Sequence, residues 1–204
     1  MGASVMAQAA NVQIYARPPR LLVATVVTED RMQGFDSWIA ALRAQETELL
    51  WDLVLCDGTD DPSPWYIRWL VAWSKSHPFG PRHRVRLLRV GLTQGEGYRD
   101  EEIKSRVARR LLWGKFENWA SYDLLLSLEV ELLIPADLIQ RLYRAGADVV
   151  TAFSARPLAC AMVARSLVEQ VPLRLTTATE DAQWLSDCRT AGVVPATIAL
   201  GGAA

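Results

Sequence analysis

Short, continuous apolar segments rich in β-branched residues determine the fold class of this chain. The first of them, at residues 21–28, reads LLVATVVT, and a run without polar alternation is typical of a strand covered on both faces. The same pattern predicts strands at 21–28, 50–56, 85–90, 124–128, 149–153 and 159–163, with an edge strand at 193–200. Helical spacing and start or stop signals predict helices at 34–45, 65–73, 100–119, 135–144 and 179–191. This alternation of strands and helices indicates an α/β fold with a mostly parallel, twisted sheet flanked by helices.

The composition fits one globular domain. The chain has 204 residues, of which 50% are hydrophobic and 22% are charged. We expect residues 1–19 to be a flexible N-terminal extension and residues 20–204 to form a single domain. Apolar runs stop well short of the roughly 20 residues that a membrane span needs, and residues 1–16 do not read as a signal peptide. Three scattered cysteines and two histidines argue against a disulfide framework and a structural zinc site. These features predict a cytoplasmic protein without a membrane span.

Carboxylates recur where the predicted strands end. Glu29 and Asp30 follow the first strand, Asp57 follows the second, and Glu129 and Glu131 follow the strand at 124–128. Because ligands bind beyond the carboxyl ends of the strands in parallel α/β sheets, this edge is the predicted binding site. The chain lacks the glycine-rich fingerprints of dinucleotide-binding and P-loop proteins.

Glu129 and Glu131 are candidate metal ligands. Two residues apart, they would leave the same face of an extended chain, and paired carboxylates suit a hard cation such as Mg²⁺ or Mn²⁺. A diphosphate would supply further oxygens. The alternative is a pair of solvated acids on an edge strand, although charge within so apolar a stretch is costly unless it is used or solvated.

Other acids also allow two interpretations. Asp57 precedes Gly58 and would either form a turn or accept hydrogen bonds from a base or ribose. Glu180 and Asp181 would either favour a helix N-terminus through its dipole or act in chemistry.

Two clusters of residues have a structural and a functional interpretation each. Trp65, Trp69 and Trp73 lie at helical spacing, which indicates core packing more often than a stacking platform. Residues 82–110 hold eight arginines and one lysine against four acids, a local charge of +5 in a chain of net charge −1. This basic segment would either balance acids elsewhere or contact a phosphate-rich partner.

Several segments, in this order, resemble family-2 glycosyltransferases of the GT-A fold over about residues 20–192. The first strand and helix of that family resemble VATVVTEDRMQGFDSWIAALRAQ, and its second strand, which ends in a base-contacting Asp, resembles LWDLVLCDGTDD. The family's helix, strand and metal-binding DxD motif resemble ARRLLWGKFENWASYDLLLSLEVELLIPADLIQRL. Its acceptor-side segment resembles ACAMVARSLVEQVPLRLTTATEDAQWLSDCRTAGV.

The resemblance implies a glycosyltransferase that uses a nucleotide-sugar donor and inverts the anomeric centre. It implies that Asp57 holds the nucleotide, with Thr28 and Arg109 as further donor contacts. Glu129 and Glu131 fall on the two DxD aspartates and would face Mg²⁺ or Mn²⁺, and Asp181 would be the general base.

The acceptor and two rival functions remain open. The acceptor would be a saccharide, or a hydroxymethylated pyrimidine in DNA, as in virus-encoded relatives of the family. The Glu-for-Asp changes also allow a non-catalytic module that binds nucleotide sugars. A sugar nucleotidyltransferase would want a Gly-rich, Lys-containing loop after the first strand, and residues 28–34 lack one.

Overall fold

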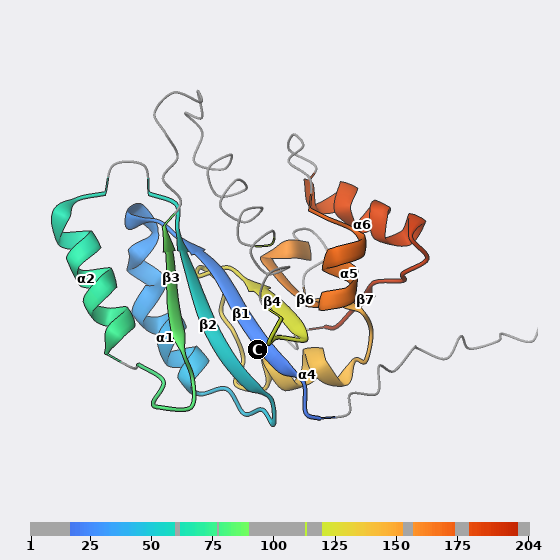
Figure 1. Ribbon diagram of the computed structural model, residues 1–204, viewed down its shortest axis with the longest axis horizontal. Helices are drawn as coiled ribbons and strands as arrows, with labels where there is room; N and C mark the ends of the chain where they lie inside the picture. The colour runs from blue at the N-terminus through green and yellow to red at the C-terminus, as the bar shows by residue number, and fades with distance from the viewer. Residues whose placement is uncertain are drawn as a thin grey trace, which may run out of the picture.

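The computed structural model describes residues 17–59, 62–76, 78–89, 113, 120–152, 157–173 and 180–199 (Figure 1). The strands are β1 (Arg20–Val27), β2 (Leu50–Asp57), β3 (Val85–Arg89), β4 (Leu124–Leu128), β5 (Val149–Thr151), β6 (Cys160–Ala164) and β7 (Ala196–Thr197). The α-helices are α1 (Phe35–Arg43), α2 (Pro64–Lys75), α4 (Leu138–Arg144), α5 (Arg165–Gln170) and α6 (Glu180–Thr190). Two short 3₁₀ helices are η1 (Glu29–Gly34) and η2 (Pro157–Ala159).

The strands form one sheet in the order β3-β2-β1-β4-β6-β5-β7. β1 pairs in parallel with β2 and β4, β2 pairs in parallel with β3, and β5 pairs in parallel with β7. Only β6 among these strands runs antiparallel to its neighbours, β4 and β5. The predicted α/β class with a mostly parallel sheet is confirmed, and the carboxyl ends of β1 to β4 meet at one edge.

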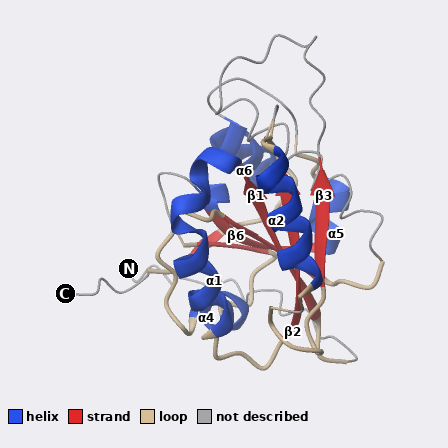
Figure 2. Ribbon diagram, turned by 90° about the vertical axis from the view of Figure 1, so that its left-hand side faces the viewer, coloured by secondary structure: helices blue, strands red, loops and turns tan. Residues whose placement is uncertain are grey.

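Helices cover both faces of the sheet. Leu21 and Val23 of β1 belong to the core beneath α1, α2 and α4, whereas Leu22 and Ala24 belong to the core beneath α5 and α6. Figure 2 shows α1 and α2 in front of the sheet, and Figure 1 shows α5 and α6 towards the opposite side. Burial of alternate residues on opposite faces explains why β1 has no polar alternation.

Most predicted elements are present; several are shorter than predicted, whereas α2 and β2 extend beyond the predicted 65–73 and 50–56. β4 matches the prediction, α6 ends shortly before Gly192, whose φ of +84° suits glycine, and β7 lies at the sheet edge that Pro195 predicted. The short elements η1, η2 and α5 were not predicted. The predicted helix at 100–119 lies outside the described residues apart from Trp113, as do residues 1–16 of the predicted extension.

The three tryptophans of α2 divide between core and surface. Trp69 and Trp73 pack edge-on against Phe35, with ring centroids 5.5 and 5.0 Å apart, whereas Trp65 is 56% exposed. Each four-residue step in a helix overshoots a full turn by about 40°. Residues at i, i+4 and i+8 therefore drift around the helix, and core packing is confirmed only for two of the three.

In the described part of the chain, no helix combines the length and the apolar character required to cross a membrane.

Candidate active site

The strand ends place the predicted site residues along one edge of the sheet. Val27 of β1 pairs with Asp57 of β2, which pairs in turn with Arg89 of β3. On the other side of β1, Ala24 pairs with Ser127, near the end of β4. Thr28, Asp57 and the turn containing Glu129 and Glu131 therefore follow neighbouring strands.

Asp57 is buried and already has protein partners. Asp57 is 1% exposed. Its Oδ1 accepts hydrogen bonds from the Thr59 N–H (3.1 Å) and the Tyr66 hydroxyl (3.2 Å). The Arg89 Nε lies 3.9 Å from Oδ2. Burial and the Asp57 charge raise the pKa of Tyr66, so this hydroxyl remains a donor. Of the two oxygens, Oδ2 is the one that faces a half-exposed cation.

Thr28 and Glu29 behave differently at the end of β1. Thr28 is 5% exposed, and its Oγ1 has no hydrogen-bond partner within the described residues. The Glu29 carboxylate accepts from both the N–H (2.8 Å) and the hydroxyl (2.6 Å) of Ser63, the N-cap residue of α2. Glu29 therefore orders the start of α2, while Thr28 keeps an unused hydroxyl.

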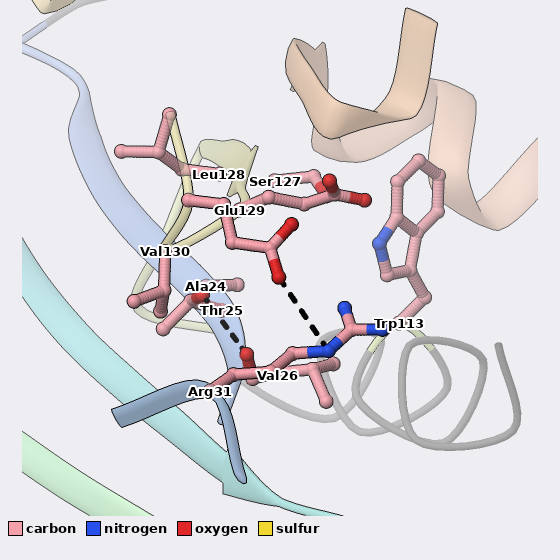
Figure 3. Close-up of a pocket in the computed structure, with 10 residues that line it drawn as sticks. Ala24, Thr25, Val26, Arg31, Trp113, Ser127, Leu128, Glu129 and Val130 are labelled. Carbon is pink, nitrogen blue, oxygen red and sulfur yellow. Dashed lines mark hydrogen bonds and ion pairs between the residues drawn. The ribbon is translucent and has the colours of Figure 1, made fainter. Parts of the chain in front are cut away.

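A small pocket with a cavity volume of about 20 Å³, partly open to solvent, lies beside these strand ends, and we call it the strand-end pocket (Figure 3). Its lining residues come from β1, η1, β4 and the turn that follows, with one contribution from the chain between β3 and β4. They are Ala24, Thr25, Val26, Arg31, Trp113, Ser127, Leu128, Glu129, Val130 and Glu131. Both predicted metal ligands are among them.

Glu129 and Glu131 share the pocket for a reason other than the predicted one. β4 ends at Leu128, and the Leu132 N–H donates to the Glu129 carbonyl oxygen (3.3 Å) in a turn. The expectation of two side chains on one face of an extended strand is therefore wrong. The turn itself brings both acids to the pocket, where Glu131 Oε1 lies 3.5 Å from Arg31 Nε.

The carboxylates fit a cation that takes most of its ligands from elsewhere. Within the described ranges, no group of three or more His, Cys, Asp and Glu side chains is placed to hold a metal. Mg²⁺ is commonly held by only one or two carboxylates together with substrate phosphates and water. Glu129 and Glu131 would supply the carboxylates of a site of this kind.

Asp181 is connected to the same pocket through η2. Its Oδ2 accepts a hydrogen bond from the Leu158 N–H (3.1 Å). The Leu158 carbonyl accepts from the Ser127 hydroxyl (2.8 Å), and the Ala159 carbonyl accepts from the Glu129 N–H (2.9 Å). Asp181 at the start of α6 and Glu129 after β4 therefore flank the same three-residue helix.

Arg31, Trp113 and Ser127 were missed by sequence reasoning, and Arg109 lies outside the described residues. Arg31 directly follows Glu29 and Asp30 at the end of the first predicted strand, so its position could have identified it as a site residue. Trp113 lies off the apolar stripes of the predicted helix at 100–119, which also set it apart.

The cysteines do not supply a nucleophile. Burial raises the pKa of the Cys160 thiol to about 12, and burial with the neighbouring Asp57 charge does the same for Cys56. The pKa of Cys188 also rises to about 12, chiefly through burial. A thiolate is therefore scarce at neutral pH.

No protein-family model matches the sequence, and no curated protein matches it. Solved structures do match. The chain superposes on the mannosyltransferase PcManGT from Pyrobaculum calidifontis, in complex with GDP-Man and Mn²⁺, with a TM-score of 0.64 and 12% identity. For S. aureus TarS the TM-score is 0.62 with 8% identity, and for TarS 1-349 in complex with UDP-GlcNAc it is 0.59 with 8% identity.

The match covers most of this chain and a smaller part of the others. It spans 91% of this chain and 56% of the PcManGT chain, and 90% of this chain with 36% or 57% of the two TarS chains. At 8–12% identity the likeness establishes the fold alone. The chain therefore has the GT-A-like glycosyltransferase fold that the resemblance implied.

Proposed function

We propose that this protein transfers a sugar from a nucleotide-sugar donor to an acceptor hydroxyl. The observation that supports this most is the position of Glu129 and Glu131 in the strand-end pocket, with Asp181 hydrogen-bonded to η2, whose Ala159 carbonyl accepts from the Glu129 N–H. Structures with the same fold hold GDP-Man with Mn²⁺, or UDP-GlcNAc.

The donor would lie across the strand ends. Asp57 Oδ2 and the unpaired Thr28 hydroxyl would contact the nucleotide, with Arg109 as a further contact. Glu129 and Glu131 would hold Mg²⁺ or Mn²⁺. Such a cation, when bound, supplies neutralisation of charge on a diphosphate leaving group.

Asp181 would act as the general base. Its carboxylate would take the proton from the acceptor hydroxyl while the hydroxyl oxygen forms a bond to the anomeric carbon. The bond from that carbon to the diphosphate oxygen breaks, and the nucleoside diphosphate leaves with the electron pair. Attack from the face opposite the leaving group inverts the anomeric centre.

We propose a saccharide as the principal acceptor and a hydroxymethylated pyrimidine in DNA as the second candidate. β3 is an edge strand, and Arg82, Arg84 and Arg89 at or beside it are exposed, which would suit phosphates. Charged side chains on an edge strand also prevent pairing with other chains, which accounts for the same residues without DNA. Arg86 is less suited to a phosphate, because its guanidinium lies 5.8 Å from the Tyr122 ring centroid.

Calorimetric titration with UDP, GDP, UDP-GlcNAc and GDP-Man, with and without Mn²⁺, tests the proposal. Binding of a nucleotide sugar, followed by release of its nucleoside diphosphate, would support the transferase. Binding without turnover in the presence of acceptors would instead favour the non-catalytic module. The proposal fails if none of the four ligands binds.

A further inference from the structure

The indole N–H of Trp113 is an unused hydrogen-bond donor in the strand-end pocket. Trp113 is 1% exposed, and its Nε1 has no hydrogen-bond partner within the described residues. A buried indole N–H normally finds a partner, because a donor removed from water without one is costly. Figure 3 shows the indole nitrogen on the side of the ring that faces Glu129 and the pocket.

The ring position is fixed by contacts that leave this nitrogen unused. Trp184 of α6 packs edge-on against Trp113, with ring centroids 5.1 Å apart and an interplanar angle of 86°. The Trp184 Nε1 itself donates to the Val171 carbonyl oxygen (3.0 Å). Of these two touching tryptophans, one has a protein partner for its N–H, and the other presents its N–H to the pocket.

Trp38 provides an internal comparison. It is also 1% exposed with an unpartnered Nε1, but it belongs to α1 and to the core on the opposite face of the sheet. It is not among the residues that line the strand-end pocket. The unpaired indole N–H of Trp113 therefore belongs to a residue that lines the strand-end pocket, whereas Trp38 does not line it.

The chemistry around Trp113 suits a ligand hydroxyl. Glu129 and Glu131 bring two carboxylates to the pocket, and carboxylate oxygens accept hydrogen bonds from a hydroxyl. The Ser127 hydroxyl hydrogen is already used on the Leu158 carbonyl. A ligand hydroxyl can donate to a carboxylate and accept from the indole N–H at the same time.

We propose that Trp113 Nε1 donates a hydrogen bond to a hydroxyl oxygen of the donor's sugar and so helps to select that sugar. This inference rests on the proposed function. Trp113 is a specificity-determining residue in this scheme, and the sugar oxygen is the partner that its N–H lacks in the free protein.

Trp113→Phe tests the inference, with Trp38→Phe as the matched control for loss of ring volume and of an unpartnered N–H. Calorimetry should show that W113F weakens binding of UDP-GlcNAc or GDP-Man by about tenfold, as expected for one hydrogen bond, and leaves UDP and GDP unchanged. W38F should leave all four affinities unchanged. The thermal stabilities of the two variants should be similar, since neither loses a protein hydrogen bond.

A measurement on the unmodified protein covers the case in which W113F does not fold. The Trp113 indole N–H signal, assigned through its cross-peaks to the Trp184 ring, should shift downfield with the nucleotide sugar more than with the matching diphosphate. Equal weakening of sugar and diphosphate ligands in W113F would overturn the assignment to a sugar hydroxyl. Unchanged affinities or an unmoved indole signal would overturn the contact. If the wild type binds no nucleotide sugar, the proposed function itself fails.

Discussion

Asp181→Asn separates the chemical role of this residue from its structural one. The Asp181 carboxylate accepts the Leu158 N–H at 3.1 Å, and Leu158 is fully buried in η2. The side-chain oxygen of Asn is able to accept the same N–H, so η2 keeps its support. An amide does not accept a proton at neutral pH, so the proposed base is lost.

The two effects have different expected sizes. Loss of a general base typically lowers the rate by about 10²- to 10⁴-fold. Replacing a charged hydrogen-bond acceptor by a neutral one should lower the free energy of unfolding by about 1 kcal/mol. This loss corresponds to about 2–4 °C in Tm for a domain of this size. Asp181→Ala should be less stable than Asp181→Asn, because it leaves the Leu158 N–H buried without its acceptor.

The assay is release of nucleoside diphosphate from whichever nucleotide sugar binds, with parallel calorimetry for donor affinity. Asp187→Asn is the matched control, since it removes the same charge from the same helix, where the Asp187 Oδ1 accepts an exposed hydrogen bond from Gln183 (2.9 Å). The expected result is a donor affinity that stays within about twofold and a turnover that falls only in Asp181→Asn. If Asp181→Asn keeps more than about a tenth of the wild-type turnover, Asp181 is not the base.

Three further predictions concern charge around the pocket and the sheet edge. Glu129→Gln with Glu131→Gln should abolish the enhancement of UDP or GDP binding by Mn²⁺, and an unchanged enhancement in calorimetry would remove the metal role. Arg31→Gln should release Glu131, which is 51% exposed, from its 3.5 Å ion pair with Arg31. Mn²⁺ binding without nucleotide should then become stronger by no more than about fivefold, the limit for an exposed ion pair. Weaker Mn²⁺ binding would refute the idea that Arg31 competes with the cation for Glu131. If DNA is the acceptor, Arg82→Glu with Arg84→Glu should flatten the log–log salt dependence of duplex binding by about 0.9 per lost phosphate contact; duplex binding that ignores salt would exclude this acceptor.

The sequence predicts those parts of the fold that burial alone specifies. β4 was predicted at Leu124–Leu128 because five consecutive apolar or small residues are buried there, with helices on both sides of the sheet. Hydrophobic periodicity does not predict α5, which has six residues, or η2, which has three, because such short helices span too few turns. The position of η2 depends on hydrogen bonds from Ser127 and to Asp181, which are remote in the sequence.

The residues of the candidate site likewise divide into those that the sequence identifies and those that only tertiary packing reveals. Residues that directly follow a buried strand, such as Thr28, Asp57 and Glu129, were identified because a parallel sheet gathers its carboxyl ends. Trp113 was not, because its importance lies in an unpaired N–H that only the packing against Trp184 reveals. Local pattern thus identifies which residues reach the edge, and tertiary contacts decide which polar atoms remain unused there.

The two ends of the sheet differ in how their buried polar groups are used. At the amino end, Asp52 is 2% exposed and accepts from Arg20 Nη2 (2.9 Å), the Tyr122 hydroxyl (2.7 Å) and the Arg84 N–H (2.7 Å). That network ties β1, β2 and the start of β3 together around one carboxylate. At the carboxyl end, Thr28 Oγ1 and Trp113 Nε1 are buried without partners in the described part of the chain. A buried polar group without a partner is destabilising, so a ligand that hydrogen-bonds to Thr28 and Trp113 would offset this cost at the carboxyl edge of the sheet.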